Sequence, residues 1–285
     1  MELKKVGIIC SNKVSDGLMM MVASHRLMSE GSSVVTFHNR LHELAKWFGD
    51  HKFAERPESA SLLDLFSDYD LVILQYDNSP YAKEVVSKLA NRKSPKLSIF
   101  YPTYSKYAHA PLTPWDRVFN KNYPMVENIS LAIASILQLR DHSKNNGIFP
   151  PPNLEHRKHK RRVAILPSKS IHKKYETIAN EVKKLGFDPF LIESENLAYG
   201  AKIIYESGYF IGPESDLCHL ASNLQIPTLV VSGNKKPLSL WKPGWLRSSF
   251  ITPPPFIPKI VERFIFTPRV TSAFKKLVAK DKIYL

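Results

Sequence analysis

The sequence predicts an α/β protein made of two halves, each a series of alternating strands and helices. Continuously apolar runs, such as 5–10 and 163–167, are typical of strands covered on both faces of a parallel sheet. Segments with apolar residues at helical spacing follow these runs, and this alternation indicates βαβ units. A stretch at 143–162 breaks the series with consecutive prolines at 150–152 and a cluster of Arg and Lys.

The first half starts with a strand at once, and residues 11–17 form the expected loop between that strand and the first helix. The strands are expected at 5–10, 33–37, 70–76 and 97–101, and the helices at 18–27, 41–48, 81–89 and 126–139. In open parallel sheets of this kind, ligands bind beyond the carboxyl ends of the strands. Functional side chains are therefore expected in the loops that follow the strands.

The second half repeats the pattern. Its strands are expected at 163–167, 189–192, 209–211 and 228–231, and its helices at 173–185, 197–206 and 217–224. The predicted domains are therefore 1–142 and 163–255, joined by a basic linker at 143–162. Residues 256–285 follow as a separate helical segment, because Phe274, Leu277 and Val278 recur at helical spacing.

Size, charge and cysteine content limit the class of protein. The 285 residues suffice for about two domains, and no apolar run is long enough to span a membrane. The formal charge of +14 concerns partners rather than fold: nucleic acid, an anionic membrane or a phosphorylated substrate. No nucleic-acid-binding motif is visible, so no nucleic-acid partner is expected. Cys10 and Cys218 lie in core-like segments, which favours a reducing cytoplasm over a disulfide or a thiolate metal site.

Residues 209–224 carry the most specific local pattern. A short buried strand ends at Ile211, and a helical stripe begins at Leu217. Ser215 is a good N-cap residue, so Glu214 and Ser215 lie where a strand ends and a helix begins. The backbone N–H groups and the positive dipole at that helix tip would suit a phosphate, although an ordinary capped turn has the same pattern.

The run from Gly208 to Trp245 resembles the donor-binding segment of glycosyltransferase family 9, the heptosyltransferase-like enzymes. That segment reads acidic residue, Ser or Thr, Gly, Leu, any residue, His and Leu, followed by a Pro-Thr strand start and a Gly turn. The residues in the matching places here are Glu214, Ser215, Asp216, Leu217 and His219, with Asp216 replacing the family's Gly. The resemblance implies the GT-B fold: two facing Rossmann-like domains, with the helical segment 256–285 crossing back onto the first domain.

Asp16 is the candidate catalytic base. An acid at the start of a helix is also a common stabilising feature without any catalytic role. However, Ser15-Asp16-Gly17-Leu18 resembles the family's Gly-Asp-x-Leu loop, with Ser15 in place of the first Gly. The resemblance implies that the Asp16 carboxylate takes the proton from an acceptor hydroxyl as its oxygen attacks the anomeric carbon with inversion.

Residues 168–175 are the candidate clamp for a pyrophosphate. Lysine and hydroxyl donors can stabilise the charge on a departing nucleoside diphosphate without a metal. Ser168 and Lys173 fit the family's Ser/Thr and Lys, with Tyr175 as its aromatic residue, and Lys169 or Lys174 could share the role. A solvated basic loop before a helix would have the same composition.

The remaining donor-side residues lie at the helix tip. The resemblance implies that His219 donates a hydrogen bond to a phosphate and that Glu214 accepts one from a sugar hydroxyl, although a histidine on a helix is more often a packing residue. Leu217 belongs to the same segment. Asp216 would repel a diphosphate unless it points away or pairs with a lysine; the candidate partners are Lys173, Lys235 and Lys236.

No metal-ligand spacing stands out, and neither a Gly-x-Gly-x-x-Gly nor a Gly-x-Ser-x-Gly motif occurs. The resemblance to family 9 implies an inverting glycosyltransferase with no cofactor beyond its nucleotide-sugar substrate, and we expect it to be metal-independent and cytoplasmic. The resemblance implies a heptose-like sugar and a lipopolysaccharide-core or other anionic glycolipid acceptor, and the basic surface suits a peripheral contact with the inner face of a membrane. Two alternatives stay open. One is a catalytically degenerate GT-B protein that only binds a nucleotide or glycan, and the other is nucleic-acid binding by the basic cluster 157–162.

Overall fold

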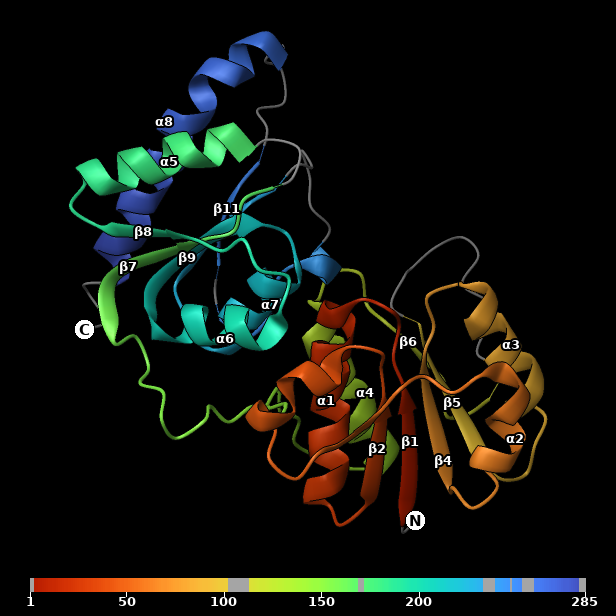
Figure 1. Ribbon diagram of the computed structural model, residues 1–285. Coiled ribbons are helices and arrows are strands. Elements are labelled where there is room, and N and C mark those ends of the chain that lie inside the picture. The colour runs from red at the N-terminus through yellow and green to blue at the C-terminus, as the bar shows by residue number, and fades with distance from the viewer. Residues whose placement is uncertain are drawn as a thin grey trace. The chain divides into compact units, whose positions relative to one another are not determined.

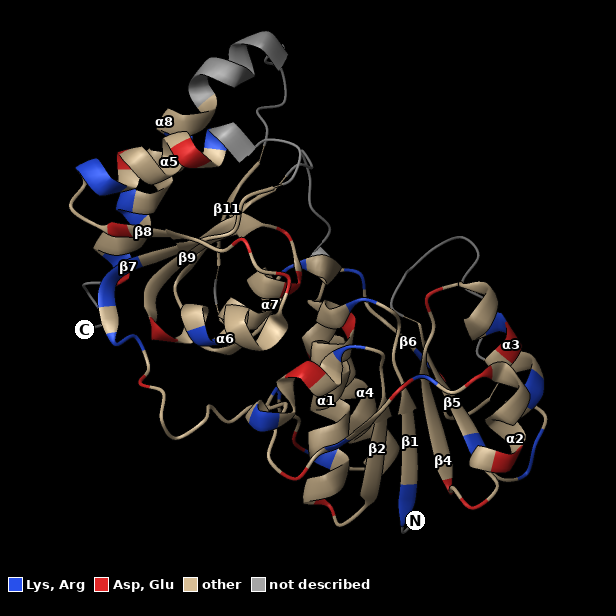
Figure 2. Ribbon diagram, viewed as in Figure 1, with Lys and Arg blue, Asp and Glu red and all other residues tan. Residues whose placement is uncertain are grey.

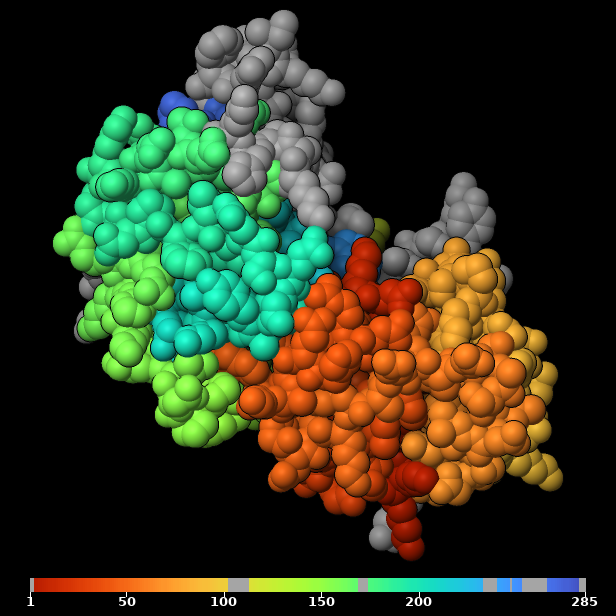
Figure 3. All heavy atoms as spheres, viewed as in Figure 1, coloured from red at the N-terminus to blue at the C-terminus, as the bar shows by residue number. Residues whose placement is uncertain are grey.

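The chain folds into two α/β units (Figure 1 and Figure 3). This is a computed structural model, and the residues described are 3–101, 113–168, 172–232, 239–246, 248–252 and 259–281, without the side chains of 172–173, 239 and 259–265. One unit comprises Met1–Pro150 with Ser239–Trp241, and the other Pro151–Leu238 with Lys242–Leu285. The two expected α/β halves therefore correspond to two separately packed units.

The sheet of the first unit has its first strand in the interior. The strand order is β3-β2-β1-β4-β5-β6, and every pair is parallel. The strands are β1 (Lys5–Ile9), β2 (Ser33–Phe37), β3 (Lys52–Ala54), β4 (Leu71–Gln75), β5 (Lys96–Tyr101) and β6 (Arg117–Val118). Because all strands run the same way, the loops that follow them share one edge of the sheet.

Helices cover both faces of this sheet, as its apolar strands require. The helices α1 (Val14–Ser29) and α4 (Met125–Leu137) pack together, and so do α2 (Leu62–Leu65) and α3 (Pro80–Leu89) (Figure 1). The second pair closes a buried core that includes Phe66, Val72, Leu74 and Val85. Three short 3₁₀ helices, Leu41–Trp47, Ser59–Ser61 and Ser239–Trp241, complete the described elements of this unit.

The sheet of the second unit follows the same plan. Its order is β11-β10-β9-β7-β8, again with every pair parallel. The strands are β7 (His159–Ile165), β8 (Asp188–Leu191), β9 (Ser207–Pro213), β10 (Thr228–Val231) and β11 (Ser249–Ile251). The helices are α5 (His172–Lys184), α6 (Leu197–Glu206), α7 (Asp216–Asn223) and α8 (Lys259–Asp281). Helices α5 and α8 pack together, as do α6 and α7 (Figure 1).

The C-terminal segment corrects one expectation. Instead of crossing back onto the first domain, α8 packs on the sheet of the second unit, beside α5. The reason is its apolar stripe: Val270, Phe274 and Leu277 are buried against a core that contains Ile178 and Leu229. A stripe of this kind predicts that a helix has a buried face, but it does not specify which sheet that face covers.

The boundaries near the middle of the chain also differ from expectation. The linker expected at 143–162 overlaps β7, which begins at His159, and the division between the units falls after Pro150. The basic residues that suggested a linker occupy the exposed first half of that strand, whereas Val163 to Ile165 are fully buried. The expected loop at 11–17 is shorter as well, because α1 begins at Val14.

Among the helices in the described part of the chain, none is both long enough and apolar enough to cross a lipid bilayer.

Candidate active site

Each sheet has a topological switch point beside its first strand. In the first unit β1 lies between β2 and β4, and in the second β7 lies between β8 and β9. The chain leaves such a strand in one direction and later returns on its other side, which opens a crevice at the carboxyl edge. A substrate-binding site is therefore expected at that edge in each unit.

Asp16 lies at the switch point of the first unit. It is in the first turn of α1, where the helix dipole stabilises a carboxylate, and its side chain is buried. Its Oδ2 accepts a hydrogen bond of 2.6 Å from the Ser11 hydroxyl. The backbone N–H of Ser11 donates in turn to Oε1 of Gln75, at 3.1 Å, at the end of β4. The carboxylate is thus oriented by groups from the two strands that border the switch point.

The start of α1 is packed closely against the loop after β2. A Cβ atom on Gly17 would lie 2.8 Å from Cδ1 of Leu41 and 2.9 Å from Cδ2 of His38, so a larger residue does not fit without movement. The Nδ1 atom of His38 faces the backbone N–H groups of Arg40 and Leu41, at 2.9 and 3.1 Å, and Nε2 faces the Lys13 carbonyl at 3.2 Å. These partners assign a neutral imidazole that donates through Nε2. Sequence reasoning did not single out His38, although its place directly after a strand was a usable signal.

A polar cavity of about 470 Å³ opens among the loops that follow the strands of the first unit. The Arg56 guanidinium lines it, bonded to Oδ1 of Asn12 and stacked 3.9 Å from the centroid of the Tyr81 ring. The backbone N–H of Arg56 also donates to Oδ1 of Asn39, at 3.1 Å. The carboxylates of Glu58 and Glu84 also line the cavity, so its amide, hydroxyl, guanidinium and carboxylate groups together suit a hydroxylated ligand. Sequence reasoning missed these residues, because no local pattern connects loops so far apart in the chain.

The donor-side candidates lie at the switch point of the second unit. Strands β7 and β9 are neighbours and parallel, and the N–H of Leu166 donates to the Ile211 carbonyl at 2.9 Å. Their carboxyl ends lead into Ser168 and into Glu214. The fold therefore brings Ser168, at the start of the candidate clamp, and the candidate helix tip to adjacent positions on one edge.

Ser215 is the N-cap of α7, as the sequence predicts. Its Oγ accepts a hydrogen bond of 3.4 Å from the Cys218 N–H, and its hydroxyl approaches the Pro213 carbonyl at 3.1 Å. The earliest N–H groups of a helix have no partner within it, so those of Asp216 and Leu217 belong to the tip that a phosphate would meet. The Leu217 side chain is buried beside Gly200 of α6, which leaves only its backbone for such a contact.

His219 is a buried, neutral imidazole. Its side chain is 4% exposed, and burial lowers its pKa to about 4, with the Asp216 carboxylate acting in the opposite sense. Its Nδ1 atom makes no hydrogen bond to any residue that the structure describes. A neutral imidazole can still donate through one ring nitrogen, so the predicted role as a donor to a phosphate is chemically open to it.

The lysines of the predicted clamp are only partly described. Lys169, Lys235 and Lys236 lie outside the described residues, and Lys173 is described as backbone within α5. The ammonium of Lys174 lies 4.8 Å from the centroid of the Phe266 ring on α8. Tyr175, the predicted aromatic residue, is fully buried in the core of the unit, and this burial raises the pKa of its hydroxyl. Within the described ranges, no group of three or more His, Cys, Asp and Glu could hold a metal ion.

The chain is similar in architecture to solved structures of glycosyltransferases. The Escherichia coli ADP-heptose lipopolysaccharide heptosyltransferase II matches with a TM-score of 0.67 and 15% identity, over 98% of this chain and 99% of that chain. A glycosyl transferase family 9 protein from Veillonella parvula matches with a TM-score of 0.66 and 11% identity, over 98% and 99%. This chain has the GT-B fold of the heptosyltransferases. The E. coli heptosyltransferase WaaC with ADP matches with a TM-score of 0.59 and 13% identity, over 92% and 98%.

The GT-B fold that the sequence implies is therefore confirmed, and so is the resemblance to family 9 at the level of the fold. Neither protein-family models nor curated protein sequences match the chain. The similarity extends over nearly the whole length of the GT-B structures, at 11–15% identity. The assignment of individual site residues thus rests on their chemistry and on their positions in this fold.

Proposed function

We propose that this protein is an inverting glycosyltransferase that transfers a heptose-like sugar from a nucleotide-diphosphate donor. The observation that supports this most strongly is that the residues of both sequence motifs lie at the topological switch points of the two sheets. Asp16 and the Glu214–His219 segment were selected from the sequence, and each lies at the carboxyl edge beside the first strand of its sheet. The whole-length similarity to heptosyltransferase structures, one of them with ADP, supports an ADP-linked donor.

The proposed reaction begins at Asp16. Its carboxylate takes the proton from the acceptor hydroxyl while that oxygen bonds to the anomeric carbon and the bond from that carbon to the donor phosphate oxygen breaks. The hydrogen bond from Ser11 orients the carboxylate, so the base needs little reorganisation as the reaction proceeds. The departing electron pair stays on the nucleoside diphosphate.

Charge on the leaving diphosphate is stabilised by the second unit. The tip of α7 offers backbone N–H groups and the positive end of a dipole, and Ser168 with Lys169 and Lys173 forms the proposed clamp. In this proposal the reaction is metal-independent, with Glu214 and His219 holding a sugar hydroxyl and a phosphate.

The acceptor is proposed to be an anionic glycolipid of the lipopolysaccharide-core type. The cavity beside Arg56 in the first unit supports a sugar-containing acceptor, because its amide, guanidinium and carboxylate groups can form hydrogen bonds with sugar hydroxyls. A cytoplasmic location, with peripheral contact at the inner face of a membrane, completes the proposal.

Turnover of ADP-, GDP- and UDP-linked sugars with a lipopolysaccharide-core acceptor tests the proposal. The wild-type chain should release the nucleoside diphosphate only when donor and acceptor are both present. An Asp16→Asn variant should keep donor affinity and lose turnover, whereas ordinary turnover by that variant would remove Asp16 as the base.

A second candidate function is a catalytically degenerate GT-B protein that binds a nucleotide or glycan. Asp216 favours it, because this carboxylate is the first residue of α7, at the tip where a diphosphate would bind. A chain that binds no nucleoside diphosphate would support this alternative. Nucleic-acid binding by 157–162 is less well supported, since Arg157 is engaged by Asp281 and Arg161 by the Gly186 carbonyl.

A further inference from the structure

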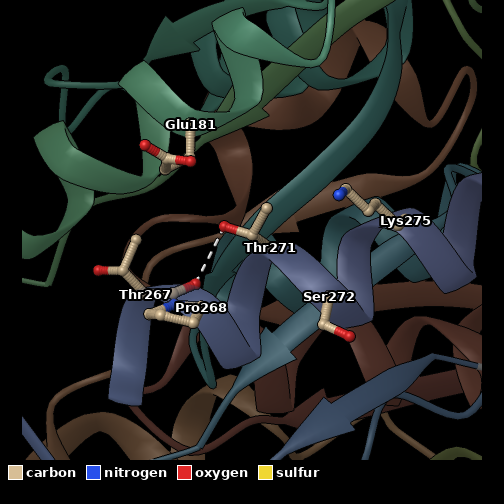
Figure 4. A pocket seen from close by; sticks show the side chains of 6 residues that line it. All are labelled: Glu181, Thr267, Pro268, Thr271, Ser272 and Lys275. Carbon is tan, nitrogen blue, oxygen red and sulfur yellow. Dashed lines mark hydrogen bonds between the residues drawn. The ribbon is translucent and has the colours of Figure 1, made fainter. Parts of the chain in front are cut away.

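Two adjoining hollows border the α5–α8 side of the second unit. One, of about 280 Å³, is mostly apolar and is lined by Leu185, Phe187, Phe274, Lys275, Val278 and Ala279. The other, of about 490 Å³, is polar and is lined by Glu181, Thr267, Pro268, Thr271, Ser272 and Lys275 (Figure 4). Lys275 borders both hollows, and we call the two hollows together the α5–α8 groove, with an apolar part and a polar part.

The apolar part of the groove is held in shape by its surroundings. The Phe187 ring packs edge-on against the rings of Phe274 and Tyr209, with centroids 5.1 and 5.6 Å apart. The end of α8 is fixed by Asp281, which binds the Arg157 guanidinium through both carboxylate oxygens, at 3.1 and 2.5 Å, and accepts a hydrogen bond of 2.8 Å from the Tyr209 hydroxyl. The groove is therefore present before any ligand binds.

Basic residues predominate around this groove, with some acidic residues on α5 and at β8 (Figure 2). The exposed basic residues at the ends of α5 and α8 and at the start of β7 are Lys183, Lys184, Lys275, Lys276, Lys280, Lys158, Lys160 and Arg161. The carboxylates are fewer: Glu181 pairs with Lys184 at 2.7 Å, Asp281 pairs with Arg157, and Glu176 and Asp188 are exposed. The field at the groove mouth is therefore attractive to anions.

We propose that the α5–α8 groove binds an anionic phospholipid of a bilayer surface. Part of an acyl chain or the glycerol backbone enters the apolar hollow, and the phosphate meets the ammonium of Lys275, which borders both hollows. Nucleic acid would also be attracted by the lysines, but it has no aliphatic segment for a hollow walled by Leu185 and Val278. Apolar insertion combined with several lysines is the pairing that holds peripheral proteins on anionic bilayers.

The position of the groove is compatible with the proposed transferase activity. The biological role of lipid binding inferred here rests on that proposed function. The apolar hollow lies where α5 ends and β8 is about to begin, toward the amino ends of the strands. The donor-side candidates Ser168 and Glu214 lie beyond the carboxyl ends of β7 and β9. Contact with a bilayer at the groove would therefore leave the donor-side edge of the same unit open.

Co-sedimentation of the full chain with vesicles tests the proposal. Vesicles of phosphatidylcholine with phosphatidylglycerol are compared with phosphatidylcholine alone, without nucleotide sugar. We expect the chain to bind the anionic vesicles at least about tenfold more strongly. A Lys275→Glu, Lys276→Glu double variant should lose most of this preference, whereas Lys202→Glu, an exposed position on α6, should change it by less than about twofold.

A second pair of variants tests the hollow rather than the charge. Ala279 is exposed at the apolar hollow, so the uncharged change Ala279→Gln should fold normally and weaken vesicle binding several-fold, while Ala279→Leu should preserve it. Equal binding to neutral and anionic vesicles, or an Ala279→Gln variant that binds like the wild type, would overturn the proposal. The proposal would also be overturned if the chain bound a single-stranded oligonucleotide more tightly than the anionic vesicles and the same variants abolished that binding. Binding of an acidic protein instead of the anionic vesicles would overturn it as well. The affinity of these variants for nucleoside diphosphates is measured as well. Unchanged nucleotide affinity together with weakened vesicle binding would show that the lipid proposal and the proposed transferase activity are tested separately.

Discussion

The Ser11 hydroxyl donates a hydrogen bond of 2.6 Å to the Asp16 carboxylate, and both side chains are buried beyond the end of β1. Because the Ser11 backbone also bonds to Gln75 at the end of β4, the carboxylate has a fixed place beside the switch point of the sheet. A general base benefits from such positioning more than from flexibility, since it must meet the acceptor hydroxyl at hydrogen-bond distance.

The loss in kcat should therefore be larger when the base is removed than when the residue that orients it is removed. Asp16→Asn should lower kcat by about 10²- to 10⁴-fold, the usual contribution of a general base. Ser11→Ala keeps the carboxylate and should cost only about tenfold, through lost orientation. Steady-state rates measure both effects, and the Kd for the nucleoside diphosphate should be unchanged. Equal rate losses for the two variants would mean that Ser11 does more than orient Asp16.

Gly17→Ala should destabilise the first unit, although the same change at an open helical position usually stabilises a helix. The added Cβ would lie within 3 Å of the Leu41 and His38 side chains, and overpacking of this kind costs about 1–3 kcal/mol. Urea unfolding measures the loss. An unchanged or larger free energy of unfolding would show that the loop after β2 can give way.

Asp281→Ala should weaken the second unit more than removal of an exposed ion pair would. The Arg157 and Asp281 side chains are only 14% and 11% exposed. The change therefore leaves a largely buried guanidinium without its carboxylate partner and removes the acceptor of the Tyr209 hydroxyl. We expect a loss of about 3 kcal/mol in the free energy of unfolding. The control is Asp68→Ala. Because the Asp68–Lys5 ion pair is exposed, this change should lower the free energy of unfolding by less than about 1 kcal/mol. Similar losses for both variants would contradict this difference.

Acid should destabilise the second unit through His219. Its folded pKa, about 4, is below the ordinary value of 6.5, so the unfolded chain binds the proton more readily. The contribution is fully present above pH 6.5 and is lost as the pH falls from 6.5 through 4, to a total of roughly 3 kcal/mol. His219→Gln should flatten this part of the stability profile in denaturant titrations at several pH values. A profile as steep as that of the wild type would assign the acid sensitivity of the second unit to other groups, such as His156, whose pKa burial also lowers.

The regular elements were predictable where the local pattern was strong. Helix α6 and strand β10 have the bounds that periodicity and β-branched content predict. Helix α1 starts earlier than predicted, because Lys13 at its N-cap offers no side-chain hydrogen bond and so no capping signal. Strands β3, β6 and β11 were missed, since two or three residues are too few to show a period.

The site was predictable only at the level of single loops. Asp16 and Ser215 have recognisable neighbours in the sequence, and the structure places both at strand–helix junctions. The contact of Ser11 with Gln75 joins residues 64 apart, and Arg56 meets Asn12 across 44. Such contacts depend on the order of strands in the sheet, which local patterns do not specify. For the same reason the sequence predicted α8 as a helix but assigned it to the wrong unit.

The central claim is that the carboxyl edge of the second sheet holds the diphosphate of a sugar nucleotide. The most direct test is the melting temperature of the wild-type chain with ADP, GDP, UDP and CDP in turn. The account predicts that one of them, with ADP favoured, raises the melting temperature by about 5 °C when present at about one hundred times its Kd. If none of the four shifts the melting transition at millimolar concentration, the claim is contradicted.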